Sequence, residues 1–154
     1  MLNIFEKAKK RHPFDLHAYC LMTNHVHFLL ETKDVHVSKI MHYLLSTYAH
    51  YFNKRYELNG HVFEKRFSAV LIKDHQHFVD TSRYIHLNPY KAKICDSPIK
   101  YPWSSYKEFL RKDIKDKNPL IDTRRTLSYF GEDPITFYKQ YCEFASLSKA
   151  DHSR

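Results

Sequence analysis

Apolar residues recur along the chain in short runs, and polar or proline-containing breaks separate these runs. Helical spacing is clearest over residues 38–56, where an apolar or aromatic side chain returns every four positions from Ile40 to Phe52. Residues four apart share one face of a helix, so this stretch predicts an amphipathic helix. Ser38 is the predicted N-cap of this helix, because a serine hydroxyl accepts well from the first free backbone N–H groups.

Two apolar runs of strand length, 15–22 and 25–31, flank the dipeptide Thr23-Asn24. Two such runs around a two-residue break predict a β-hairpin.

The remaining runs predict one further strand and several helices. They are a basic helix over 3–12 before Pro13, a strand over 61–73, a helix over 75–87 after Asp74, a Pro/Ser loop over 95–106, an exposed connection over 112–119, and two small helices within 120–147 around Gly131 and Pro134. Pro89 disfavours helical backbone at Asn88, so the helix that starts at residue 75 should end there. The order α-β-β-α-β-α predicts an α+β fold with helices packed on an antiparallel sheet.

Length and charge narrow the class of protein. A chain of 154 residues favours one domain with one core. It holds 25 Lys and Arg against 17 Asp and Glu, together with 12 Tyr and 11 Phe. Cations neutralise phosphates and rings stack on unpaired bases, so this composition suits a nucleic acid, although a merely solvated basic surface would have the same composition. With 2 Gly in the chain, a glycine-rich phosphate loop is not expected.

The cysteines and the N-terminus indicate the compartment. Cys20, Cys95 and Cys142 are odd in number and far apart, which fits neither a disulfide framework nor a zinc ribbon. We interpret them as reduced thiols of a cytoplasmic protein. The first ten residues lack the apolar stretch of a signal peptide, and no apolar run is long enough to span a membrane, so no membrane partner is expected.

Two histidines stand one residue apart at the start of the second predicted hairpin strand. On a strand, residues i and i+2 point to the same side, so His25 and His27 would lie side by side and could chelate one divalent cation. The pair alone is a weak signal, because histidines on strands more often find hydrogen-bond partners. His75 and His77 repeat the spacing but open a predicted helix, where i and i+2 do not face each other, so we discount them.

Tyr84 and Asn88 are four residues apart near the end of a predicted helix and therefore share a face. A tyrosine phenol can act as a nucleophile, and an asparagine amide oxygen can ligate a hard cation. A buried tyrosine followed by an asparagine C-cap before Pro89 would give the same pattern.

Four segments then carry a more specific signal: AYCLMTNHVHFLLE, GHVFEKRFSAVLI, SRYIHLNPYKAKI and YPWSSY. In their order and approximate spacing, from about residue 5 to residue 145, the chain resembles the REP-associated tyrosine transposases. These are single-tyrosine members of the HUH superfamily and relatives of the small insertion-sequence transposases.

The resemblance implies a ferredoxin-like antiparallel sheet with helices packed on it. We divide the chain into a catalytic domain over residues 1–111 and a helical extension over 112–154. By resemblance, Tyr84 is the nucleophile, and the ligands of Mg²⁺ or Mn²⁺ are His25, His27 and Asn88. Contacts with DNA are implied for the following basic residues: Lys65, Arg66, Lys73, Arg83, Lys91 and Lys93.

The implied reaction is the cleavage and rejoining of single-stranded or hairpin DNA. The Tyr84 oxygen would attack a phosphate, leaving a 5′-phosphotyrosine link and a free 3′-hydroxyl, while the metal offsets the developing charge. A later attack by a 3′-hydroxyl would rejoin strands, and because the covalent link conserves the phosphodiester energy, ATP is not needed. The resemblance allows either a monomer or a homodimer.

The N-terminus departs from the family pattern. Family members begin with a strand before the first helix, whereas Met1 falls almost at that helix, so we expect the sheet to lack its central first strand. One alternative is therefore a catalytically decayed protein that still recognises DNA hairpins.

Another alternative rests on the histidine pair. It is a metal-dependent hydrolase whose histidines activate water.

Overall fold

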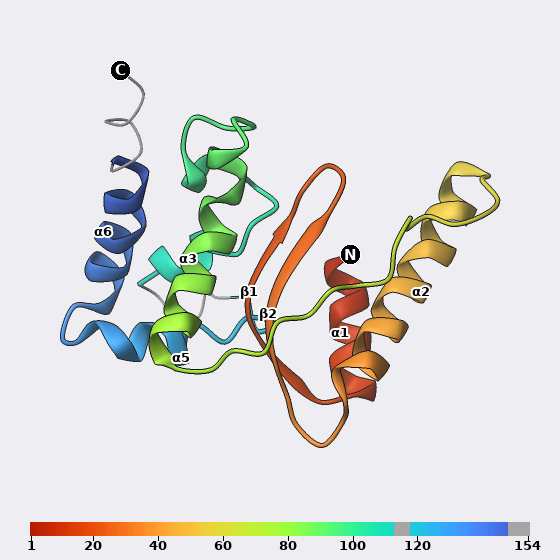
Figure 1. Ribbon diagram of the computed structural model, residues 1–154, viewed down its shortest axis with the longest axis horizontal. Helices are drawn as coiled ribbons and strands as arrows, with labels where there is room; N and C mark the ends of the chain where they lie inside the picture. The colour runs from red at the N-terminus through yellow and green to blue at the C-terminus, as the bar shows by residue number, and fades with distance from the viewer. Residues whose placement is uncertain (113–117, 148–154) are drawn as a thin grey trace. The chain divides into compact units, whose positions relative to one another are not determined.

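The computed structural model describes residues 1–112 and 118–147 (Figure 1). In chain order its elements are α1 (Leu2–Arg11), β1 (Phe14–Leu21), β2 (Val26–Thr32), α2 (Val37–Tyr56), α3 (His75–Lys91), η1 (Pro98–Lys100), α4 (Tyr106–Leu110), α5 (Arg124–Leu127), η3 (Ser128–Phe130) and α6 (Pro134–Leu147). Strands β1 and β2 form a two-stranded antiparallel hairpin, and helices pack against it. The predicted α+β class is therefore confirmed, as are the hairpin and the first two helices.

The chain forms two compact units, one of residues 1–15 and 31–71 and the other of residues 16–30 and 72–154. The first unit contains α1 and α2. The second unit contains most of the hairpin and the helices from α3 onward. The division at residue 111 into a catalytic domain and an extension stays a prediction.

In the first unit, α1 and α2 pack on each other through apolar faces. Helix α2 has its N-cap at His36, whose Nδ1 accepts from the backbone N–H of Ser38 at 3.2 Å. The prediction of Ser38 as the cap was wrong, because Ser38 already lies in the first turn and its own N–H is one of the groups that need an acceptor.

The predicted strand over residues 61–73 was wrong. The described residues of this segment form no β-ladder, and Val70 and Leu71 are 76% and 83% exposed. Strand propensity measures how well side chains fit a pleated, half-buried surface, and it does not supply a neighbouring strand. Strand β1 instead makes single bridges from Leu16 to Ile121 and from Cys20 to Ser104.

One hydrophobic cluster of the second unit lies between the hairpin and α3. It comprises Ala18, Cys20, Met22, Leu29, Phe78, Ile85 and Tyr101. Burying Phe78 and Ile85 against the strands fixes which face of α3 turns toward the hairpin. That choice also fixes the direction in which the neighbouring positions on α3 project.

Helix α3 does not end at Asn88 as predicted but continues through Pro89 to Lys91. Pro89 is fully buried, and the helix closes with bonds from Lys93 N–H to Tyr90 O and from Ile94 N–H to Pro89 O, both 2.9 Å. This pair of bonds is a Schellman motif, in which Lys93 takes the left-handed position with φ 57°. The packing of Pro89 and this cap outweigh the local preference against helix before a proline.

The two helical segments predicted within 120–147 are confirmed by α5 with η3 and by α6. Of the connection predicted over 112–119, residues 113–117 lie outside the described part of the chain. Across the described ranges, no helix has both the length and the apolarity that crossing a membrane requires.

Candidate functional site

His25 and His27 lie side by side at the start of the second hairpin strand. Strand β2 begins at Val26, so His25 falls just before it, yet the ring centroids of the two histidines are 4.8 Å apart. The Nδ1 atom of His25 lies 2.6 Å from Asn24 Oδ1. An amide oxygen only accepts, so Nδ1 is the donor in this contact.

Helix α3 brings Tyr84 and Asn88 to this histidine pair. The Tyr84 ring centroid is 5.5 Å from that of His27, and Asn88 Nδ2 is 3.1 Å from His27 Nε2. All four predicted residues therefore belong to one cluster within the second unit. Tyr84 is 49% exposed, so about half of this residue is open to solvent.

The protonation state of His27 suits ligand binding. Burial lowers the pKa of His27, and the neighbouring His25 lowers it further. A lowered pKa keeps the imidazole neutral near pH 7, and only a neutral imidazole can give its lone pair to a cation. The bond from Asn88 Nδ2 shows that Nε2 is the unprotonated nitrogen of His27.

The donor set fits a divalent cation of intermediate hardness. Within the described residues no three His, Cys, Asp or Glu side chains gather at a metal-binding distance, so the candidate ligands are two imidazoles and one amide. Mg²⁺ prefers an all-oxygen shell, whereas transition metals accept imidazole nitrogen. The amide of Asn88 would have to present Oδ1 in place of Nδ2.

A buried polar network holds the opposite side of α3. His86 is fully buried, with Nδ1 2.7 Å from Tyr138 Oη and Nε2 2.8 Å from Ser105 Oγ. Ser82 Oγ also lies 2.8 Å from Tyr138 Oη, and Ser105 Oγ accepts from Tyr19 N–H in β1. Strand β1, α3 and α6 are thus linked through one imidazole. This fixes the rotation of α3, and with it the position of Tyr84.

Sequence reasoning gave His86 no role, although it stands two residues after Tyr84. Burial lowers the pKa of His86 to about 3, so its imidazole is neutral. Its partners are distant in the sequence, and nothing within the helix marks it as buried. Asn24 was also missed as the partner of His25. An asparagine beside a predicted histidine pair is a signal that could have suggested it.

The six basic residues implied to contact DNA lie in different settings. Lys73, Lys91 and Lys93 are exposed, and the Lys91 Nζ atom is 5.6 Å from the Tyr84 ring centroid. Lys65 and Arg66 are exposed residues of the first unit. DNA contact by these residues stays a prediction.

Arg83 is engaged within the protein. Its guanidinium is 2.6 Å from Asp80 Oδ1 and stacks 4.0 Å from the ring centroid of Tyr141. Burial of Asp80 would raise its pKa, but hydrogen bonds from Tyr141 and Gln76 and the charge of Arg83 lower it overall. Arg83 therefore ties α3 to α6, and a phosphate would have to compete with Asp80 for it.

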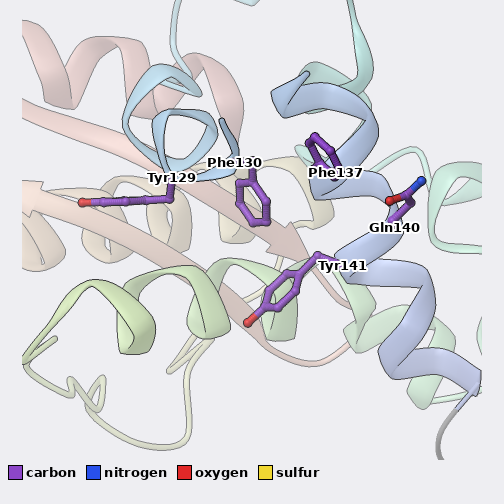
Figure 2. A pocket seen from close by; sticks show the side chains of 5 residues that line it. All are labelled: Tyr129, Phe130, Phe137, Gln140 and Tyr141. Atoms are coloured by element: carbon purple, nitrogen blue, oxygen red, sulfur yellow. The ribbon is translucent and has the colours of Figure 1, made fainter. Parts of the chain in front are cut away.

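Tyr141 also lines an open hollow between η3 and α6. Figure 2 shows its lining residues, Tyr129 and Phe130 on one side and Phe137, Gln140 and Tyr141 along α6. None of the residues predicted as nucleophile, metal ligands or DNA contacts lines this hollow.

The discounted histidine pair indeed separates. His75 Nδ1 is 2.9 Å from Tyr129 Oη, whereas His77 Nδ1 accepts from the backbone N–H of Lys73.

The fold and the cluster together define an α+β protein that gathers two imidazoles, an amide and an exposed phenol where a hairpin meets a helix. The sequence comparisons agree on a family. The family model described as "Transposase IS200 like" matches residues 1–88, which include all four residues of the cluster. The chain belongs to this family of transposases, and membership implies DNA as the partner.

A more specific relative comes from Haemophilus influenzae. The chain is 27% identical to a protein provisionally named a REP-associated tyrosine transposase, with 73% of each sequence covered. No solved structure matches the chain.

Proposed function

We propose that this chain cleaves and rejoins single-stranded or hairpin DNA through a 5′-phosphotyrosine link on Tyr84, as a cytoplasmic enzyme acting as a monomer or homodimer. The observation that carries the proposal is the position of His27, which adjoins both the nucleophile and the third candidate ligand. His25, His27 and Asn88 would hold a divalent cation, Mn²⁺ or Mg²⁺. When bound, such a cation supplies Lewis-acid polarisation of the phosphate and offsets its developing charge.

The residues of the chain would divide the remaining work. The Tyr84 oxygen attacks phosphorus, its proton passes to solvent, and the new bond is a phosphotyrosine ester. The bond from phosphorus to the DNA 3′-oxygen breaks, and this oxygen takes up a proton as it leaves. Lys91 lies over the Tyr84 ring at 5.6 Å and helps to orient it, since a cation is attracted to an aromatic face at this distance.

Rejoining reverses the same exchange. A 3′-hydroxyl attacks the phosphotyrosine, the tyrosine oxygen leaves and recovers a proton, and a DNA phosphodiester is restored. One phosphodiester-type bond is broken for each one made, so the strand exchange is close to energetically neutral. The half-exposed phenol matters here, because the incoming hydroxyl must reach the covalent link.

The test is a gel assay for an SDS-resistant adduct between the protein and a labelled hairpin oligonucleotide in Mn²⁺. We expect an adduct with the unaltered chain and none with Tyr84→Phe or with His25→Ala/His27→Ala. The matched control is His75→Ala/His77→Ala, which removes two histidines at the same spacing from a place where they do not converge.

Other outcomes would favour the alternatives. Cleavage without an adduct, unchanged by Tyr84→Phe, would indicate a hydrolase that activates water. Hairpin binding with neither cleavage nor adduct would indicate a decayed transposase that retains only recognition.

A further inference from the structure

Helix α2 carries an apolar face that α1 does not cover along its whole length. In the first half of α2, Ile40, Met41 and Leu44 are buried. The same face continues in the second half with tyrosine and phenylalanine, since these positions recur at intervals of three and four residues. There Tyr51 is 54% exposed and Tyr56 is 59% exposed.

The rings of this second half form a contiguous row. Tyr48 lies at centroid distances of 6.5 Å from Tyr51, 6.0 Å from Phe52 and 5.9 Å from Phe63. Phe52 is 4.7 Å from Tyr56. The inner rings therefore support one another, and Tyr51 and Tyr56 form the open ends of the row.

Positive charges are interleaved with these rings. Arg55 is four residues after Tyr51 and directly precedes Tyr56, so it lies between the two open rings along the helix. Lys54 is exposed beside it, and Lys65 and Arg66 are exposed after Phe63. Within the described residues, none of these four cations is within ion-pair distance of a carboxylate.

The charge balance of the segment favours an anionic partner. Glu57 and Glu64 are the acidic residues among positions 48–66, so the four cations outnumber the carboxylates two to one. Tyrosine and arginine also occur at protein–protein interfaces, but an excess of cations without carboxylate partners complements the phosphates of a single-stranded nucleic acid, whose bases stack on open rings.

We propose that this aromatic–basic face, formed by Tyr51, Lys54, Arg55 and Tyr56, binds the unpaired bases and phosphates of single-stranded DNA. The choice of DNA rests on the proposed function. Tyr51 and Tyr56 stack on bases, while Lys54 and Arg55 neutralise phosphates. The face lies wholly within the first unit, whereas the candidate metal ligands belong to the second. Binding here therefore requires neither the metal nor Tyr84.

Fluorescence anisotropy with a labelled oligothymidylate of about 20 nucleotides, longer than usual single-strand site sizes, tests this in EDTA, where cleavage is suppressed. Tyr51→Ala/Tyr56→Ala should weaken binding roughly 5- to 150-fold for each base that loses its stacking ring. Lys54→Gln/Arg55→Gln should reduce the slope of log affinity against log salt by about 0.7 per cation.

Two matched control variants remove the same number of rings or charges from other parts of the protein. Tyr129→Ala/Phe137→Ala removes exposed rings from the second unit, and Lys7→Gln/Lys10→Gln removes two exposed charges from α1. The proposal would be overturned if the tyrosine variant had the same affinity as its control, or if the charge variant had the same salt slope as its control. The proposal would also be overturned if the α2 variants changed the mass of the protein in analytical ultracentrifugation but left its affinity for the oligonucleotide unchanged. The occupant of the face would then be a second copy of the chain.

The two proposals fail separately. Loss of affinity in the α2 variants of a protein that forms no adduct would refute the tyrosine chemistry and support this face. Adduct formation with unchanged affinity in the α2 variants would do the reverse.

Discussion

The amide of Asn88 donates to Nε2 of His27 across 3.1 Å, and this bond joins α3 to β2. The lone pair that accepts this hydrogen bond is the one that a cation would use. The amide nitrogen and a cation therefore compete for the same atom. A half-turn of the amide replaces Nδ2 by Oδ1, which removes the competitor and adds an oxygen ligand.

Asn88→Asp should raise the affinity for Mn²⁺ by roughly tenfold, a change of about 1.4 kcal/mol. A carboxylate has no N–H to compete for His27 and contributes a negative charge to the site. Asn88→Leu should lower the affinity by a similar factor. Isothermal titration calorimetry measures both affinities. Asn3→Asp, at an exposed position of α1, is the control for the added charge. Equal affinities for the Asp and Leu variants would show that residue 88 is not a ligand.

The free energy of unfolding should fall as the pH drops below about 6.5. Burial lowers the pKa of His86 to about 3, against 6.5 in the unfolded chain. Between these values the unfolded chain binds a proton that the folded chain does not. Stability is therefore fully present above the unfolded pKa and decreases by up to about 1.4 kcal/mol per pH unit below it.

Urea denaturation at a series of pH values measures this slope. Replacing exposed His61 with Gln should leave it unchanged. The imidazole NMR signals of His86 give a direct check that does not require a variant to fold. If they show protonation near pH 6 in the native state, the assignment of the slope to this residue is wrong.

Tyr138→Phe should destabilise the protein by about 1–3 kcal/mol. The change keeps the ring but removes the hydroxyl that meets Ser82 Oγ and His86 Nδ1, both of which would be left buried with one partner fewer. Tyr129→Phe is the matched control, because its hydroxyl meets the exposed His75 and water can replace it. Thermal denaturation compares the stability of the two variants. Equal losses of stability would show that the buried network contributes no more than an exposed hydrogen bond.

Lys93→Gly should stabilise the protein by about 0.5–1 kcal/mol, because relief of left-handed backbone strain exceeds the added unfolded-state entropy of glycine. Lys93 holds φ 57°, a conformation that glycine adopts without steric cost, and no side-chain hydrogen bond is lost among the described contacts. Lys93→Ala separates the backbone effect from the loss of charge, since alanine keeps the strain. A variant series in which Ala and Gly behave alike would show that the left-handed position is not limiting.

Features set by local periodicity were predictable from the sequence, and features set by distant partners were not. The spacing from Ile40 to Phe52 defines α2 because a helix satisfies its backbone internally. The segment 61–73 has strand-like side chains, but a strand also needs a neighbour that the local sequence does not specify. Pro89 stays helical because burial and the Schellman cap outweigh the statistical rule.

The same distinction applies to the site. The side-by-side histidines and the shared face of Tyr84 and Asn88 follow from the geometry of a strand and a helix. Their convergence on one another was suggested by the family resemblance, because no periodicity relates residue 27 to residue 88. The buried state of His86 escaped both approaches, since its partners are 19 and 52 residues away.

The contacts of the Tyr138 hydroxyl also decide which part of the chain can support the candidate site on its own. The family match ends at residue 88, yet the helix that bears the candidate nucleophile is anchored by a side chain fifty positions beyond that match. A domain graft that kept only the matched segment would carry the site without its support. Substitutions in α6 that remove the Tyr138 contacts would therefore alter the position of Tyr84, although every residue of the cluster stays the same.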